Sequence, residues 1–254
     1  MKKLFLILAL LPRLLLAQSA FQNGSIQNGQ IGVAASGGGG GATWTLVAHT
    51  NASAAVSGGT ATSGAIDTTG AKFLAVTLNW AGGGPVVFSD NKANTWTTSV
   101  NYTNNNPKVQ WYFVTNATGG VGSGHTFSAS CPGLKISFHV YAFSVTSGQP
   151  TVDVEAAGAR TSSWLGNILS PGSLTPSTAN DLFLSSVAWD VNTATTVTNN
   201  ANFIYTEPLT FTGAGFMSGY KIHVGDASAE NPGWLQFPTA NDDADANHIA
   251  FKLQ

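Results

Sequence analysis

An acidic segment near the C-terminus, residues 241–247, gathers side chains that could bind a metal ion. Asp242, Asp243 and Asp245 supply hard carboxylate oxygens at nearly alternate positions, which is the ligand chemistry that calcium prefers. The segment is not an EF-hand loop, because His248 stands in place of the required glycine and no glutamate closes the loop. We expect a solvated acidic loop, with a calcium site at these three aspartates as the alternative and no other cofactor.

Asp153 and Glu155 form a second acidic pair. In an extended segment the two side chains point to the same side, roughly 7 Å apart, a spacing compatible with paired-carboxylate hydrolysis of glycosides. Because the pair lies in the connection between two strand-rich halves of the chain, a solvated face is the simpler expectation. An extracellular carbohydrate-active hydrolase or lyase is therefore the third functional hypothesis, behind two that need no catalysis.

Other catalytic signatures are missing from the sequence. It contains no G-x-S-x-G motif, and its only cysteine, Cys131, is expected to be a buried, inert thiol. His139, His223 and His248 fall on the strand faces opposite the apolar residues and share those faces with lysines, which repel a metal cation. We expect exposed, hydrogen-bonding histidines, and the missing signatures favour a non-catalytic protein over an enzyme.

Flat aromatic rings offer a different chemistry, because exposed rings can stack on sugars. The sequence has seven tryptophans, and alternation along the predicted strands assigns three of them to the core: Trp80, Trp111 and Trp189. Trp44, Trp164 and Trp234 adjoin loops rich in Gly, Ser or Thr and are candidate ligand-binding residues. Core or edge packing is the simpler expectation for each of these three, and a ligand platform is the alternative.

The composition restricts the class of protein that must position these residues. Charged residues make up 9% of the 254 residues, the formal net charge is −2 and no basic cluster occurs, so nucleic acid is not an expected partner. The N-terminus, Met1-Lys2-Lys3 followed by LFLILALLPRLLLA, has the pattern of a secretory signal peptide that ends at Ala17, with Ala20 as the alternative end. We expect a secreted or cell-surface protein with no transmembrane segment after cleavage.

The rest of the chain divides into a lead and a β-rich domain. Residues 18–42 are rich in Gly, Asn and Gln without apolar periodicity, which predicts a flexible lead. Residues 43–254 contain short β-type runs separated by Gly, Asn and Pro, which favours one all-β domain, a β-sandwich or jelly roll. The predicted strands are 43–49, 72–80, 94–100, 108–115, 125–130, 134–144, 181–189, 202–206, 216–224, 233–237 and 247–253.

The strands form two series that align at a constant offset of 109 residues. The alignment matches Leu74 with Phe183, Trp80 with Trp189 and Val140 with Ile249. A slip of one residue would turn a strand inside out, so preserved apolar phase is informative even where identities are few. The offset predicts two pseudo-repeated halves, about 43–150 and 151–254, that share one core.

Several stretches resemble a group of secreted β-sandwich modules from environmental bacteria. They include AIDTTGAKFLAVTLNW, FSDNKANTWTT, VGSGHTFS, VYAFS, PGSLTPSTANDLFLSSVAW, NPGWLQF and HIAFKL, over about residues 60–254. Ala93 departs from the group, which usually has glycine in the tight turn before the Asn-Thr-Trp strand. The resemblance implies an all-β extracellular module and carries no catalytic residue to this chain.

Export, low charge and the lack of catalytic motifs favour a non-catalytic binding or adhesion module. Its expected partner is a polysaccharide or another cell-surface component, contacted through exposed aromatic and amide side chains. The alternative is a structural protein of a cell surface, filament or particle, for which low-charge exposed strands would favour self-assembly.

Overall fold

The computed structural model describes residues 41–54, 58–81, 84–99, 107–131, 135–190, 196–199, 202–205, 209–211, 214–237 and 242–254. The expected signal peptide and the lead up to residue 40 lie outside these ranges. Every regular element within them is a β-strand. No helix in the described residues is long and apolar enough to cross a membrane.

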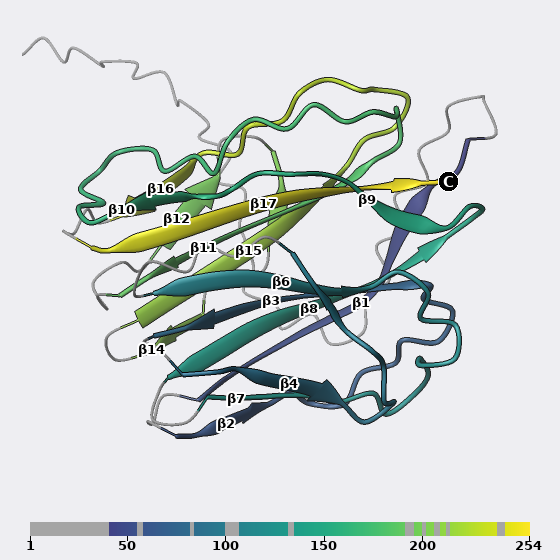
Figure 1. The fold of residues 1–254 in the computed structure, drawn as a ribbon, viewed down its shortest axis with the longest axis horizontal. Helices are drawn as coiled ribbons and strands as arrows, with labels where there is room; N and C mark the ends of the chain where they lie inside the picture. Colours follow the sequence, from purple (N-terminus) through teal and green to yellow (C-terminus); the bar gives the residue numbers. More distant parts are fainter. Residues whose placement is uncertain are drawn as a thin grey trace, which may run out of the picture. The chain divides into compact units, whose positions relative to one another are not determined.

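Two large antiparallel sheets form the centre of the fold (Figure 1). The five-stranded sheet has the order β1 (Trp44–Ala54), β8 (Ile136–Val145), β3 (Phe73–Trp80), β6 (Lys108–Val114) and β5 (Thr97–Thr98). The seven-stranded sheet has the order β10 (Ala159–Thr161), β17 (Ala244–Leu253), β11 (Leu182–Trp189), β15 (Ala214–Ile222) and β13 (Ile204–Tyr205). It is completed by β9 (Pro150–Glu155), which pairs with β17, and β14 (Leu209–Phe211), which pairs with β15.

Two smaller sheets accompany them. The three-stranded sheet contains β2 (Thr60–Thr62), β7 (Phe127–Ser130) and β4 (Val87–Asp90). The two-stranded sheet pairs β12 (Thr196–Asn199) with β16 (Trp234–Phe237). Figure 1 shows the three-stranded sheet on the far side of the five-stranded sheet from the seven-stranded one, so that three β layers are stacked.

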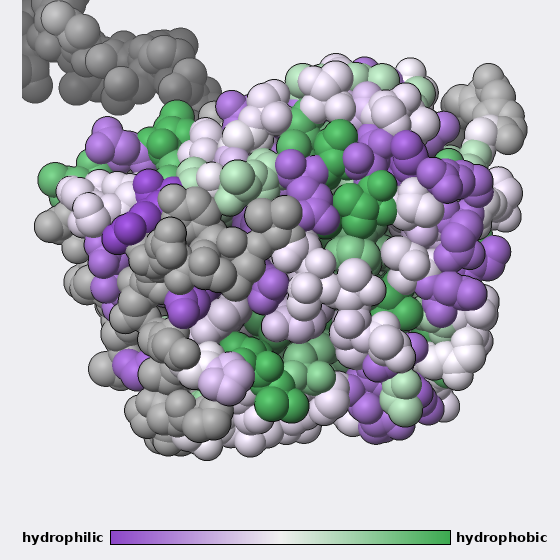
Figure 2. Space-filling view, viewed as in Figure 1, coloured by the Kyte–Doolittle hydropathy of each residue, from purple (hydrophilic) through white to green (hydrophobic). Residues whose placement is uncertain are grey.

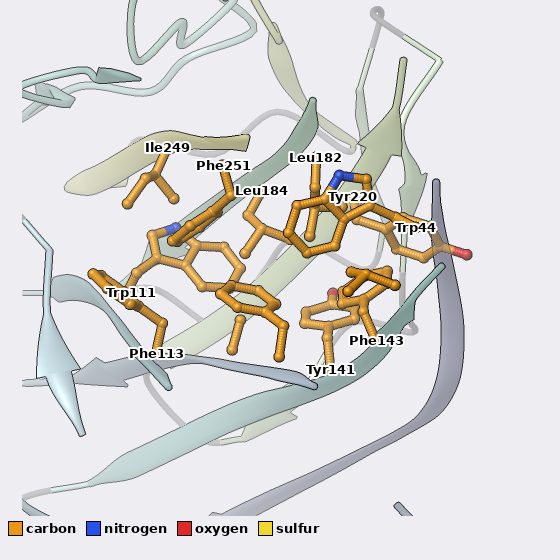
Figure 3. Packing of buried hydrophobic residues seen from close by; sticks show 13 residues of the cluster. Trp44, Trp111, Phe113, Tyr141, Phe143, Leu182, Leu184, Tyr220, Ile249 and Phe251 are labelled. Atoms are coloured by element: carbon orange, nitrogen blue, oxygen red, sulfur yellow. The ribbon is translucent and has the colours of Figure 1, made fainter. Parts of the chain in front are cut away.

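One aromatic-rich core holds the two large sheets together (Figure 3). The Phe73 ring on β3 lies 4.6 Å from the Phe251 ring on β17, and Phe113 on β6 lies 5.0 Å from the same ring. Leu182, Leu184 and other buried residues from both sheets complete the cluster. Burying apolar surface on the facing sides of two sheets is the main driving force for a sandwich, and the predicted all-β sandwich is confirmed.

The outer faces of both large sheets are covered as well. Val76, Phe138 and Val140 pack under the three-stranded sheet, whereas Val187 and Trp189 pack under segments that carry Trp164 and Trp234. All eight residues of the central strand β3, and all eight of β11, are consequently buried. The prediction of exposed histidines is wrong, because His139, His223 and His248 are all buried. His223 and His248 pack against Phe183 on the covered outer face of the seven-stranded sheet, whereas His139 faces the interior between the two large sheets, where its Nδ1 lies 2.6 Å from Ser218 Oγ.

The pairing register does not confirm a repeat at a constant offset. Val76 of β3 pairs with Val140, but Ser185, at the matching position of β11, pairs with His248. Val140 therefore corresponds to His248 and not to Ile249. Val140 faces the outer layer and Ile249 faces the central core, so the proposed match joins opposite sheet faces.

Candidate ligand-binding site

The turn that follows β4 is organised by one carboxylate, Asp90. Its Oδ1 accepts the backbone N–H of Lys92 at 2.7 Å, and its Oδ2 accepts the indole N–H of Trp96 at 2.8 Å. Burial would raise the pKa of Asp90, but hydrogen bonding by His125, Lys92 and Trp96 outweighs it and lowers that pKa. Asp90 is therefore an anionic clamp that fixes the backbone of residues 90–96.

Ala93 occupies the tightest point of this turn with φ of 57°. The left-handed region places a Cβ close to backbone oxygen, at a cost of roughly 1–2 kcal/mol for residues other than glycine. Strained backbone persists only where its surroundings hold it, and it is often found beside functional sites.

The segment after β6, which contains Ala117 and Gly120, lies opposite the Asp90 turn. The Ala117 N–H donates to the Lys72 carbonyl at 3.0 Å, and the Gly120 N–H donates to the Ala117 carbonyl at 2.8 Å. The Asn94 side-chain amide crosses from the turn and donates to the Gly120 carbonyl at 2.7 Å. A Cβ on Gly120 would overlap the Asn94 amide, so any larger residue there would have to displace that amide.

An open depression of about 320 Å³ lies between the Asp90 turn and the segment after β6. Its lining is polar and small, and consists of Lys92, Ala93, Asn94, Thr95, Val114, Asn116, Gly119 and Gly120. The lining contains an ammonium, two amides and a hydroxyl, but no carboxylate. No ion pair joins Lys92 to a carboxylate of the described residues. The arrangement can hydrogen-bond a neutral or anionic ligand.

The three tryptophans expected at a ligand platform lie inside the protein. Trp44 is 4% exposed, and Trp164 and Trp234 are fully buried. Their indole N–H groups donate to the Asn180 carbonyl at 2.9 Å, the Asn167 carbonyl at 2.8 Å and the Ser185 hydroxyl at 3.1 Å, respectively. Trp44 on β1 is thereby tied to the segment before β11, Trp164 closes its own loop, and Trp234 ties β16 to β11. None of the three rings presents an open face for stacking on a sugar.

The three candidate calcium ligands are also separated. Asp242 is buried and accepts a hydrogen bond from the Gln236 side chain, whereas the Asp243 backbone N–H donates to Asp190 Oδ1 at 2.9 Å. Ala244 and Ala246 face the outer cluster with Trp164, so alternation turns the Asp245 side chain between them toward the other sheet. Within the described residues no group of three metal-binding side chains occurs, and the calcium alternative gains no support.

Asp153 is held by residues other than Glu155. The backbone N–H of Ser177 donates to Asp153 Oδ2 at 2.5 Å, and Lys252 Nζ lies 3.0 Å from Oδ1. Burial would raise the pKa of Asp153, but the hydrogen bonds from Ser177 and Lys252 lower it to about 2. Burial and then the nearby Asp153 raise the pKa of Asp181 to about 6. Both carboxyl groups are nearly inaccessible, so the cluster fastens the segment before β11 to the sheet.

The sequence alone pointed to Ala93 but not to its partners in the depression. The stretch Asp90-Asn91-Lys92-Ala93-Asn94 is typical of a turn, which was the available signal. Asn116 and Gly120 lie more than twenty positions further along the chain and reach the turn only through the tertiary fold.

The chain was compared with protein-family models, curated proteins and solved structures. None of the three comparisons found a match. The sandwich, the clamped turn and the depression beside it are therefore the observations from which a function must be argued.

Proposed function

We propose that this protein is a non-catalytic binding module that holds a hydroxyl-rich ligand, such as a segment of polysaccharide, in the depression beside Ala93. The observation that carries the proposal is the rigid, polar and carboxylate-free lining of that depression. Export to the outside of the cell, as expected from the N-terminal segment, belongs to the same proposal and would bring the module to such a ligand.

The chemistry of the lining matches a sugar better than an apolar ligand. Amide and hydroxyl groups both donate and accept hydrogen bonds, as sugar hydroxyls do, and Lys92 adds a donor suited to a uronate or a sulfate ester. On the face drawn in Figure 2 the described hydrophobic residues form small separate areas, which suits a polar ligand. Because no aromatic ring lines the depression, the proposal relies on hydrogen bonds held in place by the Asp90 clamp.

Binding to a panel of neutral and acidic polysaccharides, measured by calorimetry, tests the proposal. Lys92→Met and Thr95→Ala should each weaken binding about tenfold, since each removes one polar group at the ligand. Lys108→Met is the matched control, because Lys108 begins β6 at the opposite end from Val114 and lies near the Trp80 ring. Binding that is absent from the whole panel, or equal in all three variants, would contradict the proposal.

A structural role is the second candidate, favoured by one feature of β1. This strand is at the end of the five-stranded sheet, is 11 residues long and contains no Asp, Glu, Lys, Arg or Pro. Long uncharged edge strands are templates for pairing with another chain. Size-exclusion chromatography with light scattering would favour this role if the molecular mass rose with concentration and fell in a Thr50→Lys variant.

A further inference from the structure

The facing sides of the two large sheets change character along their length. The inward residues of β3 are Phe73, Ala75, Thr77 and Asn79, and those of β11 are Leu182, Leu184, Ser186 and Ala188. Both central strands thus pass from large apolar residues to small or polar ones. All of these residues are almost completely buried.

Hydrogen bonds show which polar residues meet across the sheets. Ser218 Oγ on β15 lies 2.6 Å from His139 Nδ1 and 2.7 Å from the Tyr141 hydroxyl, both on β8. Thr77 is paired with His139 on one side and Trp111 on the other, and Ser186 is paired with Ser218. The row containing Thr77 and Trp111 therefore faces the row containing Ser186.

In these facing rows Thr77 Oγ1, Ser186 Oγ and Trp111 Nε1 are buried and have no hydrogen-bond partner among the described residues. Buried polar groups are normally satisfied by protein or by ordered water, so a cluster of three needs a physical explanation. Two hydroxyls and one indole N–H together offer both donors and acceptors.

We propose that ordered water is bound between the two sheets and bridges Thr77, Ser186 and Trp111. Stacked sheets lie about 10 Å apart, and small side chains such as Thr77 and Ser186 do not span that distance. A buried water molecule usually makes two to four hydrogen bonds, which matches this set of groups. The Trp111 N–H donates to the water, and the hydroxyls accept from it or donate to it.

The direction of the stability change on removing the Thr77 or Ser186 hydroxyl distinguishes a hydrated interior between the sheets from a dry one. Thr77→Val and Ser186→Ala should each lower the melting temperature by about 2–4 °C, because each deprives the water of a partner. If the hydroxyls are unsatisfied in a dry interior, the same changes would raise the melting temperature and overturn the proposal. Ser185→Ala is the matched control on the outer face of β11, where the hydroxyl has two partners and its loss should lower the melting temperature.

A crystal structure at high resolution supplies the direct test. We expect water density within about 3.2 Å of at least two of the three polar atoms. The double variant Thr77→Val/Ser186→Ala should then destabilise by less than the two single changes combined, because both act through the same water. An empty interior, direct hydrogen bonds among the three groups or density for a larger solute would each overturn the assignment.

Discussion

At the scale of single residues, the left-handed backbone of Ala93 gives the most direct prediction of a change in the free energy of unfolding. Ala93→Gly removes the cost of a left-handed alanine but adds the greater flexibility of glycine in the unfolded chain. We expect the balance to stabilise the protein by about 0.5–1 kcal/mol in urea unfolding. Ala93→Val, with a branched Cβ at the same φ, should destabilise it. A loss of stability in the glycine variant would mean that the turn does not strain Ala93.

Two buried imidazoles predict sensitivity to acid. Burial lowers the pKa of His139 and of His248 to about 3. Between about pH 6.5 and 3 the unfolded chain binds protons at these positions and the folded chain does not, so stability is lost as the pH falls through this range. Asp181, with its pKa raised to about 6, acts in the opposite direction, since its contribution is lost as the pH rises from 3.8 through 6. The pKa shifts of the two histidines are together larger than the shift of Asp181, so we expect the protein to lose stability overall as the pH falls.

The free energy of unfolding, measured at several pH values between 7 and 4, checks this prediction. His248→Gln should reduce the slope by up to about 1.4 kcal/mol per pH unit. Asp181→Asn should make the slope steeper, because it removes the opposing contribution. A stability that is flat across this interval in the parent protein would show that the imidazoles are not buried in their neutral form.

At the scale of elements, the contact between the Asp90 turn and the segment after β6 predicts a contrast between neighbouring glycines. Gly120→Ala should displace the Asn94 amide, destabilise the protein by about 1–3 kcal/mol and weaken ligand binding. Gly119→Ala is the control for stability, because a Cβ there meets nothing within 4 Å. Urea unfolding of both variants and calorimetric binding of the Gly120 variant provide the measurement, and equal losses of stability would contradict the proposed role of this contact.

The elements also show what the sequence could and could not predict. The expected strands 72–80 and 181–189 contain β3 and β11, and Trp80, Trp111 and Trp189 are buried as expected. The faces of the strands were misjudged where irregular segments cover the seven-stranded sheet, because such segments have no periodicity to read. His248 is the clearest case, since its strand pattern indicated an exposed side chain but Phe203 and Gly172 lie against it.

The candidate site was less predictable than the strands for a related reason. The alternation of apolar residues is a local signal, whereas the depression joins Asn94 to Gly120 through a backbone approach that only tertiary packing creates. Tryptophans near loops suggested a surface platform, but a large ring beside a loop is equally suited to anchoring that loop. Trp164 shows this second role, with its indole N–H bound to the carbonyl of Asn167 in its own loop.

At the scale of the whole molecule, the central core makes the two large sheets interdependent. Phe251 of the seven-stranded sheet contacts Phe73 and Phe113 of the five-stranded sheet. Neither sheet can keep its inner face buried if the other unfolds, because the cluster draws residues from both. We therefore expect one cooperative unfolding transition, with equal calorimetric and van't Hoff enthalpies.

Phe251→Ala tests this interdependence. Removing the ring leaves a cavity between the sheets and should destabilise the protein by about 3–5 kcal/mol while the transition stays single. Val87→Ala, which shortens a side chain that is 61% exposed, is the control and should change stability by less than about 0.5 kcal/mol. Two separate transitions, or a variant in which part of the chain melts early while the rest keeps its parent stability, would show that the halves fold independently around separate cores.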